Sequence, residues 1–591
     1  MICAYCGHTN EQGGNFCARC GAQLMQDKQP AYTPNAEEPT FDPEPPIRPR
    51  SAKTASSQKM AGSPESAGSS RLSGYGRAVR GIRRTAMKSP LMKILMFAVP
   101  AVIVVVAAIV IISLLGGSGS AMRKNHIAFF SDSGETIVSG NNNAKFTLDG
   151  GLESFQISLD GSKAVALTDY DFRTGGTLWF VTASGGTHIA DDVFAYQLAD
   201  SGNGVAYFTD HDARNELAAL YLYDTSNNRA TLLTDAAYYD GYGYMPGVAI
   251  SPNGKSVGYI ADYDARNFEF AGYIRIDGKA AEKLGDEMFA VAISDGGRHL
   301  YFCKLDVRTR EASLHVRSGR NENRLVPDVG NVTIMLNRDY SEIIYSVHDG
   351  DHRTFISRNG SERERISGAA ISSILVPRGA QVRTHYNDFS NITVYGMSSL
   401  SNFTAITDEG IAYYNNRLEA NRIAASSDYS SGAEISGNGK TLYYINNSMR
   451  LSSIDPTVPG AERREIDRDV VSFTSAGDGR SVYYVNDENE LLYVSGSGAP
   501  VRIADDVAHS GLSISHSGNR LFFLVEYRSG RGGELFFSNN GGRRTKVSGA
   551  DDVLSVWSTP TNIFFVTRDS ELFRSNGNDN FSMFHEDIDW R

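Results

Sequence analysis

The sequence predicts an all-β protein, a β-propeller of about seven to ten four-stranded blades, preceded by a small zinc ribbon and one transmembrane α-helix. Three observations support this prediction. Short apolar runs recur after residue 125 with a period of about 40 residues. Four cysteines are paired within the first 20 residues, and 22 consecutive uncharged residues lie between these two regions. We therefore divide the chain into a zinc ribbon (1–26), a disordered linker (27–90), a membrane span (94–115) and a propeller ectodomain (125–591).

The N-terminal cysteines form two CxxC pairs, in the segments CAYC and CARC. Each pair bends the chain so that two sulfurs face one point, and two pairs complete a tetrahedral site for Zn²⁺. Metal coordination supplies the folding free energy that so short a module does not gain from apolar burial. The sequence predicts one structural zinc ion bound by four thiolates, those of Cys3, Cys6, Cys17 and Cys20. A redox function of the CxxC pairs is the competing interpretation.

The segment CAYCG…NFCARCGAQL resembles the short zinc-ribbon module at the N-termini of many bacterial membrane proteins. The resemblance covers about residues 1–25 and implies a closed structural site, at which a cytoplasmic protein partner would dock. The fifth cysteine, Cys303, lies in the apolar run LYFCKL. Since it is the only cysteine of the ectodomain sequence, no disulfide can form there, and we expect a buried apolar residue.

The linker at 27–90 is rich in Pro, Glu, Ser and Gly and carries basic residues near its end. Such a segment buries too little surface to fold, so we expect a disordered tether; a ligand for an SH3-like partner is the alternative. Residues 1–93 have 13 Lys or Arg and 7 Asp or Glu, whereas the remainder has 44 and 61. The acidic ectodomain repels phosphate backbones, which argues against nucleic-acid binding, and the basic segment suits anionic lipid.

The uncharged run ILMFAVPAVIVVVAAIVIISLL occupies residues 94–115. As a helix it would be about 33 Å long, which matches a hydrocarbon core of about 30 Å. Seven Lys or Arg residues precede the run from residue 71 onward, and two follow it closely. The positive-inside rule therefore places the N-terminus in the cytoplasm and the propeller outside, in a single-pass cell-membrane protein. A cleavable signal peptide is disfavoured, because about 93 residues precede the run.

The repeats of the ectodomain share a turn glycine, mostly spaced by about 40 residues or a multiple, at Gly161, Gly202, Gly254, Gly296, Gly439, Gly479 and Gly518. Each unit continues with a second pair of strand-like runs, and four strands per 40 residues is the period of a propeller blade. We count about ten units between residues 154 and 591. The segment before them is expected to add a strand that closes the ring. The exact blade number and the choice between one ring and two stay open.

The pattern AISPNGKSVGYI resembles the TolB-like and prolyl-oligopeptidase-like propeller repeats, which are loosely related to WD40 repeats, over roughly residues 125–591. The Trp-Asp pair of true WD40 repeats is absent. No GxSxG motif occurs, and the repeats leave no room for the hydrolase domain of prolyl-oligopeptidase relatives. The segment GNGKT at 437–441 lacks the first glycine of a phosphate loop, since Glu434 occupies that position, so we interpret it as a strand turn.

A second motif, Asp-x-Arg followed by Thr or Asn, occurs five times at intervals of about one blade: Asp171/Arg173, Asp212/Arg214, Asp264/Arg266, Asp306/Arg308 and Asp351/Arg353. The simplest interpretation is that the Asp starts a hairpin turn and the Arg is solvated. A charged rim for a protein or polymer partner is the alternative. A calcium role through Asp169/Asp171 and Asp262/Asp264 is weaker, because calcium needs six or more oxygens.

The loop AAYYDGYGYMPG places four tyrosines among glycines: Tyr238, Tyr239, Tyr242 and Tyr244. Tyrosines on a loop can anchor a partner or stack on a sugar, because each ring combines a large contact area with a polar tip. Packing against a neighbouring loop explains the same pattern equally well.

The function predicted from these features is non-enzymatic, with no catalytic residues assigned. We expect a membrane-anchored binding or scaffold protein whose propeller recognises an extracytoplasmic protein, peptide or cell-wall polymer. The alternative is a propeller-type enzyme, a lyase or a glycoside-acting protein. Carboxylates of several blades that converge in a deep pocket with shifted pKa values would favour the enzyme, and a shallow charged rim would favour binding.

Overall fold

The computed structural model describes residues 127–588, apart from 133, 141–143, 242–244, 246, 268, 307, 310, 328–331, 348–351, 378–379, 388–389, 429–430, 561 and 576–579. The four zinc-ribbon cysteines, the linker and the predicted span at 94–115 lie outside these residues. Among the described residues, no helix combines the length and the apolar character that a membrane crossing requires. Residues Ser120–Arg591 form one compact unit, which contains all of the described strands.

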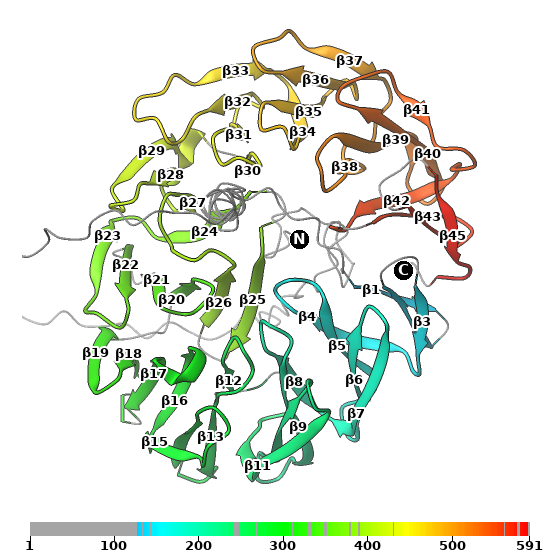
Figure 1. The fold of residues 1–591 in the computed structure, drawn as a ribbon. Coiled ribbons are helices and arrows are strands. Elements are labelled where there is room, and N and C mark those ends of the chain that lie inside the picture. The colour runs from blue at the N-terminus through cyan, green and yellow to red at the C-terminus, as the bar shows by residue number, and fades with distance from the viewer. Residues whose placement is uncertain are drawn as a thin grey trace, which may run out of the picture. The chain divides into compact units, whose positions relative to one another are not determined.

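Small antiparallel sheets follow one another around a ring, so the described residues form a β-propeller (Figure 1). Blade 1 has three strands, β1 (Ala128–Asp132), β2 (Glu135–Ser139) and β3 (Lys145–Leu148). Blade 2 consists of β4 (Leu152–Ile157), β5 (Lys163–Asp171), β6 (Gly175–Thr182) and β7 (Gly185–Val193). Blade 3 consists of β8 (Ala195–Leu198), β9 (Gly204–Asp212), β10 (Leu217–Asp224) and β11 (Arg229–Tyr238).

The next blades repeat this order. Blade 4 has β12 (Ala249–Ile250), β13 (Val257–Asp264), β14 (Glu269–Arg275) and β15 (Glu282–Asp286). Blade 5 has β16 (Met288–Ile293), the 3₁₀ turn η1 (Asp295–Gly297), β17 (His299–Asp306), β18 (Glu311–Ser318) and β19 (Asn321–Val326). Blade 6 has β20 (Val332–Leu336), β21 (Glu342–Val347), β22 (Arg353–Arg358) and β23 (Glu364–Ser367). Blade 7 has β24 (Ile371–Leu375), β27 (Phe403–Thr407), β28 (Gly410–Tyr414), β29 (Ala420–Ala425) and the turn η2 (Ser426–Asp428).

Four more blades complete the ring. Blade 8 has β30 (Ser431–Ile435), β31 (Leu442–Ile445), β32 (Leu451–Ile454) and β33 (Arg464–Asp467). Blade 9 has β34 (Val470–Ser475), β35 (Ser481–Asn486), β36 (Leu491–Ser495) and β37 (Val501–Ala504). Blade 10 has β38 (Ser513–Ile514), β39 (Arg520–Arg528), β40 (Gly532–Asn539) and β41 (Thr545–Lys546). Blade 11 has β42 (Val553–Ser558), β43 (Ile563–Thr567), β44 (Leu572–Ser575) and β45 (Ser582–His585).

The blade number exceeds the predicted seven to ten by one. Ten four-stranded blades follow residue 152, as the count of about ten repeats predicts, and they lie in a single ring (Figure 1). The expectation that the preceding segment lends one closing strand is wrong. Residues 128–148 pair with themselves, because two turns divide them into the three-stranded blade 1.

Apolar packing between consecutive blades forms the core. Each blade interface has its own cluster of buried side chains, and one further cluster joins blade 11 to blade 1. In this closing cluster Phe130 of blade 1 packs against Phe564 of blade 11, with ring centroids 5.1 Å apart. Since β1–β3 and β42–β45 belong to separate sheets, the described strands close the ring by side-chain packing and exchange no strand. The buried Cys303 lies in the cluster between blades 5 and 6, as predicted, and burial raises the pKa of its thiol.

We call the turn between the first two strands of a blade its first turn, and number the following turns accordingly. The seven turn glycines lie in first turns and adopt φ between 66° and 76°, as the repeat predicts. Consecutive first turns are bonded to each other; for example, the Leu159 N–H donates to the Asp200 carbonyl at 2.8 Å. The segment GNGKT is the first turn of blade 8, where Asn438 Oδ1 accepts the Lys440 N–H at 3.0 Å. Its interpretation as a strand turn is confirmed.

One hairpin interrupts the repeat. Strands β25 (Val382–Asn387) and β26 (Ser390–Tyr395) are inserted between β24 and β27 of blade 7, and β26 pairs in parallel with β20 of blade 6. This inserted hairpin lies on the inner side of the ring (Figure 1). Its Arg383 is 8 % exposed and donates from a terminal nitrogen to Asp200 Oδ1 of blade 3 at 3.2 Å. The hairpin therefore ties together blades that are not neighbours.

Candidate functional site

The described Asp-x-Arg motifs occupy the second turns of blades 2 to 5. In each of them the Asp accepts the N–H of the Arg two residues later, at 2.8 Å for Asp171 and 3.0 Å for Asp212. Asp264 and Asp306 make the same bond at 2.9 Å. The carboxylates therefore serve the turns, as the simplest interpretation predicts, while Arg173, Arg214, Arg266 and Arg308 are exposed. Asp351 lies outside the described residues, and Arg353 begins β22.

The calcium interpretation finds no support in the described geometry. Asp169 Oδ1 accepts the Gly151 N–H at 2.9 Å, and Asp262 accepts the Tyr273 hydroxyl. Across the described part of the chain, no group of three or more His, Cys, Asp or Glu side chains is placed to hold a metal ion.

The tyrosine loop contributes to the core of blade 3. Tyr239 is completely buried, and its ring lies 5.0 Å from Phe208 and 4.8 Å from His211, so it packs against its neighbours instead of meeting a ligand. Tyr238 is half-buried, with its ring 4.3 Å from that of Tyr263. Tyr242 and Tyr244 lie outside the described residues.

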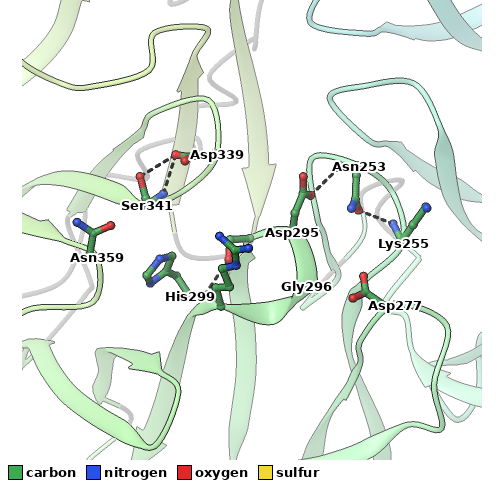
Figure 2. A pocket seen from close by; sticks show the side chains of 11 residues that line it. Asn253, Lys255, Asp277, Asp295, Gly296, His299, Asp339, Ser341 and Asn359 are labelled. Atoms are coloured by element: carbon green, nitrogen blue, oxygen red, sulfur yellow. Dashed lines mark hydrogen bonds between the residues drawn. The ribbon is translucent and has the colours of Figure 1, made fainter. Parts of the chain in front are cut away.

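A hollow lies on the opposite ends of the strands, among the first turns of blades 4, 5 and 6 and the third turns of blades 4 and 6. It has a volume of about 690 Å³, and we call it the first-turn pocket. Every described residue that lines it is polar or glycine. Figure 2 shows Asp339 and His299 toward one end, Asp295 between, and Lys255 and Asp277 at the other end. Acidic and basic groups thus alternate along the pocket.

Two carboxyl groups of the pocket have pKa values that are shifted in opposite directions from the ordinary value. Burial raises the pKa of Asp295, and the nearby carboxylates, first of all Asp277, raise it further against one backbone hydrogen bond. Burial also raises the pKa of Asp339, but hydrogen bonds from the Ser341 hydroxyl at 2.7 Å and its N–H at 3.2 Å outweigh this effect and leave the pKa lowered. Asp295 therefore holds its proton to higher pH than Asp339.

These shifts have opposite consequences for stability. The folded-state pKa of Asp295 lies above its unfolded value, so ionisation of this group disfavours folding as the pH rises from the unfolded to the folded pKa. The folded-state pKa of Asp339 lies below its unfolded value. Its contribution to stability is present above the unfolded pKa and is lost as the pH falls through the folded pKa.

The bases of the pocket come from two first turns. Lys255 follows the turn glycine of blade 4, and Arg298 and His299 follow that of blade 5. Burial lowers the pKa of His299, so its imidazole is mostly neutral near pH 7. Its Nδ1 atom is buried and has no hydrogen-bond partner among the described residues. The pocket therefore offers carboxylates, two permanent cations and one neutral imidazole.

Apart from Gly296, the sequence motifs did not single out the pocket residues, most of which lie in first turns that the repeat already explains. The signal was nevertheless present: the first turns SPNGKS, SDGGRH and NRDYSE carry acids and bases beside the turn position. Only the ring brings these three turns together.

Comparisons with known proteins give a fold-level likeness alone. No family model and no curated protein matches the chain. Among solved structures, a eukaryotic initiation factor is 10% identical at a TM-score of 0.38, with 64% of this chain and 95% of that chain covered. A prolyl endopeptidase is 11% identical at a TM-score of 0.29, covering 64% and 55%. The propeller domain of the Trilobed protease from Pyrococcus furiosus, described as having an open velcro topology, is 8% identical at 0.28, covering 53% and 94%.

Proposed function

We propose that this chain is a binding protein whose propeller recognises a charged peptide, or a polymer that carries one, in the first-turn pocket. The alternation of acids and bases among three blades carries this proposal. A peptide segment offers ammonium, carboxylate and amide groups to match these side chains. A volume of about 690 Å³ suits a ligand of a few residues, since small-molecule sites measure roughly 300–1,000 Å³.

The expected result of a binding test is selective loss in two pocket variants. The probes are an array of tetrapeptides containing Lys and Glu in varied order, and solubilised cell-wall fragments, titrated against the full chain in detergent by calorimetry. Asp295→Asn and Asp339→Asn each remove a charge-assisted contact, so affinity should fall about tenfold, or roughly 1.4 kcal/mol.

Asp160→Asn is the matched control for Asp339→Asn. Asp160 accepts the Ser162 N–H at 3.0 Å and the Ser162 hydroxyl at 2.8 Å in the first turn of blade 2, but it does not line the pocket. Equal loss of binding in the control, or no binding to any probe, would count against the proposal.

A second candidate function is a glycoside-acting or lyase enzyme at the same pocket. The opposite pKa shifts of Asp295 and Asp339 favour it, because acid–base catalysis uses two carboxyl groups whose surroundings move their pKa values apart. The same panel decides between the two functions when products are followed by mass spectrometry. Turnover that disappears in both variants assigns an enzyme, and binding without turnover assigns a receptor.

We propose further that residues 94–115 anchor the chain in the cell membrane with the propeller outside, and that the four N-terminal cysteines bind one Zn²⁺ that shapes a docking module for a cytoplasmic partner. The charge distribution around the uncharged run and the paired CxxC spacing support this.

Metal analysis tests the zinc part of this proposal. The full chain purified in detergent should contain about one zinc per molecule, and Cys6→Ser should lower this by at least several-fold, since three thiolates hold zinc less firmly than four. Cys303→Ser is the control and should keep its zinc, because Cys303 is buried in the propeller. Wild-type protein without zinc would exclude the site.

A further inference from the structure

A smaller hollow of about 200 Å³ lies between blades 8 and 9. Among the described residues that line it, Arg464 and Arg480 alone are charged. Arg464 donates to the carbonyls of Gly496 and Gly498, which fix its orientation and leave guanidinium N–H groups for another acceptor. The exposed Arg480 guanidinium makes no hydrogen bond or ion pair with the described residues. No carboxylate is among the described residues that line this hollow.

The carboxylate of Asp478 is near enough to act on Tyr443, but its hydrogen bonds are made within its own turn. Asp478 accepts the N–H groups of Arg480 and Ser481 at 2.9 Å and the Ser481 hydroxyl at 2.6 Å. It belongs to the first turn of blade 9 and does not line the hollow.

Tyr443 supplies a second, independent indication. Its side chain is 2 % exposed and lines the hollow, yet its hydroxyl has no hydrogen-bond partner among the described residues. Burial raises the pKa of this phenol to about 12, so it remains protonated and can donate. The equivalent residue of blade 9, Tyr483, has a partner, because its hydroxyl accepts the Gly541 N–H at 2.8 Å. The Tyr443 hydroxyl, with no protein partner at the wall of the hollow, is available to donate to a bound ligand.

The apolar walls of the hollow strengthen the attraction between its arginines and an anion. Val482 and Val494 are 1 % and 2 % exposed, so apolar surface surrounds the charged groups and lowers the local dielectric. The Ser453 hydroxyl also lines the hollow and has no partner among the described residues. A volume of about 200 Å³ is below that of a typical small-molecule site and suits one ionic group.

We propose that this hollow is an oxyanion site, in which Arg464 and Arg480 bind a phosphate or carboxylate group and Tyr443 and Ser453 donate to its oxygens. The site is separate from the first-turn pocket and does not depend on the function proposed for it. Phosphate and carboxylate share this chemistry, and separate titrations with the two anions distinguish them.

Titration calorimetry on the full chain in detergent tests the proposal, with inorganic phosphate and acetate as separate probes at constant ionic strength in chloride. Saturable binding of one probe is expected, and the preferred probe identifies the ligand class. Arg480→Gln should weaken it about tenfold, since a charge-assisted hydrogen bond is lost. Tyr443→Phe should weaken it about threefold to tenfold without changing the net charge.

Two controls keep the result decisive. Arg463→Gln removes an adjacent exposed arginine that does not line the hollow, and Tyr483→Phe removes the equivalent but already bonded hydroxyl. Both should bind like the wild type. Absence of saturation by either probe, or equal loss in variants and controls, would overturn the proposal.

Discussion

Replacing Arg383 by Met is expected to lower the free energy of unfolding of the propeller by about 3–5 kcal/mol, because it breaks the buried ion pair between Arg383 and Asp200. Asp200 and Arg383 are 5 % and 8 % exposed, so water does not compensate the lost pair. The Tyr340 hydroxyl also donates to Asp200, at 2.8 Å, and Arg383 donates to Gln156 Oε1 at 2.8 Å. The substitution therefore breaks the bonds of Arg383 to blades 2 and 3.

Urea unfolding followed by circular dichroism measures this effect. Arg450→Met is the control, since the ion pair of Arg450 with Glu465 at 3.0 Å is partly exposed and should contribute about 1 kcal/mol or less. Adding Asp200→Asn to Arg383→Met should restore part of the stability, because both members of the buried ion pair are then neutral. Similar midpoints for the Arg383 and Arg450 variants would contradict a stabilising role of the buried pair.

Replacing Phe564 by Ala is expected to lower the free energy of unfolding by a similar amount, about 3–5 kcal/mol, and in addition to open the ring. Phe564 is completely buried between blades 11 and 1, with its ring 5.1 Å from Phe130 and 6.0 Å from Phe584. Every other blade interface also has a chain connection. In the described part of the chain, this one is held by side-chain packing and by polar contacts such as His585 with Asp132 at 2.7 Å.

Phe522→Ala provides the matched comparison. Phe522 occupies the equivalent position in blade 10 and is also completely buried, but it packs at an interface that the chain itself joins. Both variants should lose comparable stability in urea, while small-angle scattering should show a larger radius of gyration only for Phe564→Ala. An unchanged radius in both would show that the closing interface tolerates the cavity.

The sequence predicted the features that depend on local chemistry. The turn glycines adopt the left-handed conformation that their spacing indicates, and Cys303 is buried as its apolar neighbours suggest. The inserted hairpin escaped prediction, because its alternating residues resemble any other pair of strands. Its Arg383 was unremarkable for the same reason: a charged residue is ordinarily exposed, and its partner Asp200 lies 183 positions earlier.

The same distinction between local features and contacts of distant residues applies to the candidate site. The Asp-x-Arg motif was recognisable as a repeated turn, and the structure gives its carboxylates that local role. The first-turn pocket depends on three turns that are about 40 residues apart in sequence. Asp295 and Asp339 occupy similar turns, yet their pKa values move in opposite directions, since burial and then nearby carboxylates raise the first, whereas several hydrogen bonds outweigh burial at the second. No pattern of neighbouring residues in the sequence predicts this difference between the two pKa values.

The way in which the first and last blades meet bears on how such a molecule can evolve. Where a propeller's terminal blade mixes strands from both ends of the chain, a duplicated unit must preserve that exchange. Here every described blade is built from one contiguous stretch, apart from the inserted hairpin, and the two ends join through ordinary apolar side chains. Duplication or loss of one unit in the gene would therefore leave a closing surface of the same kind, and ring size becomes a trait that selection can adjust one blade at a time.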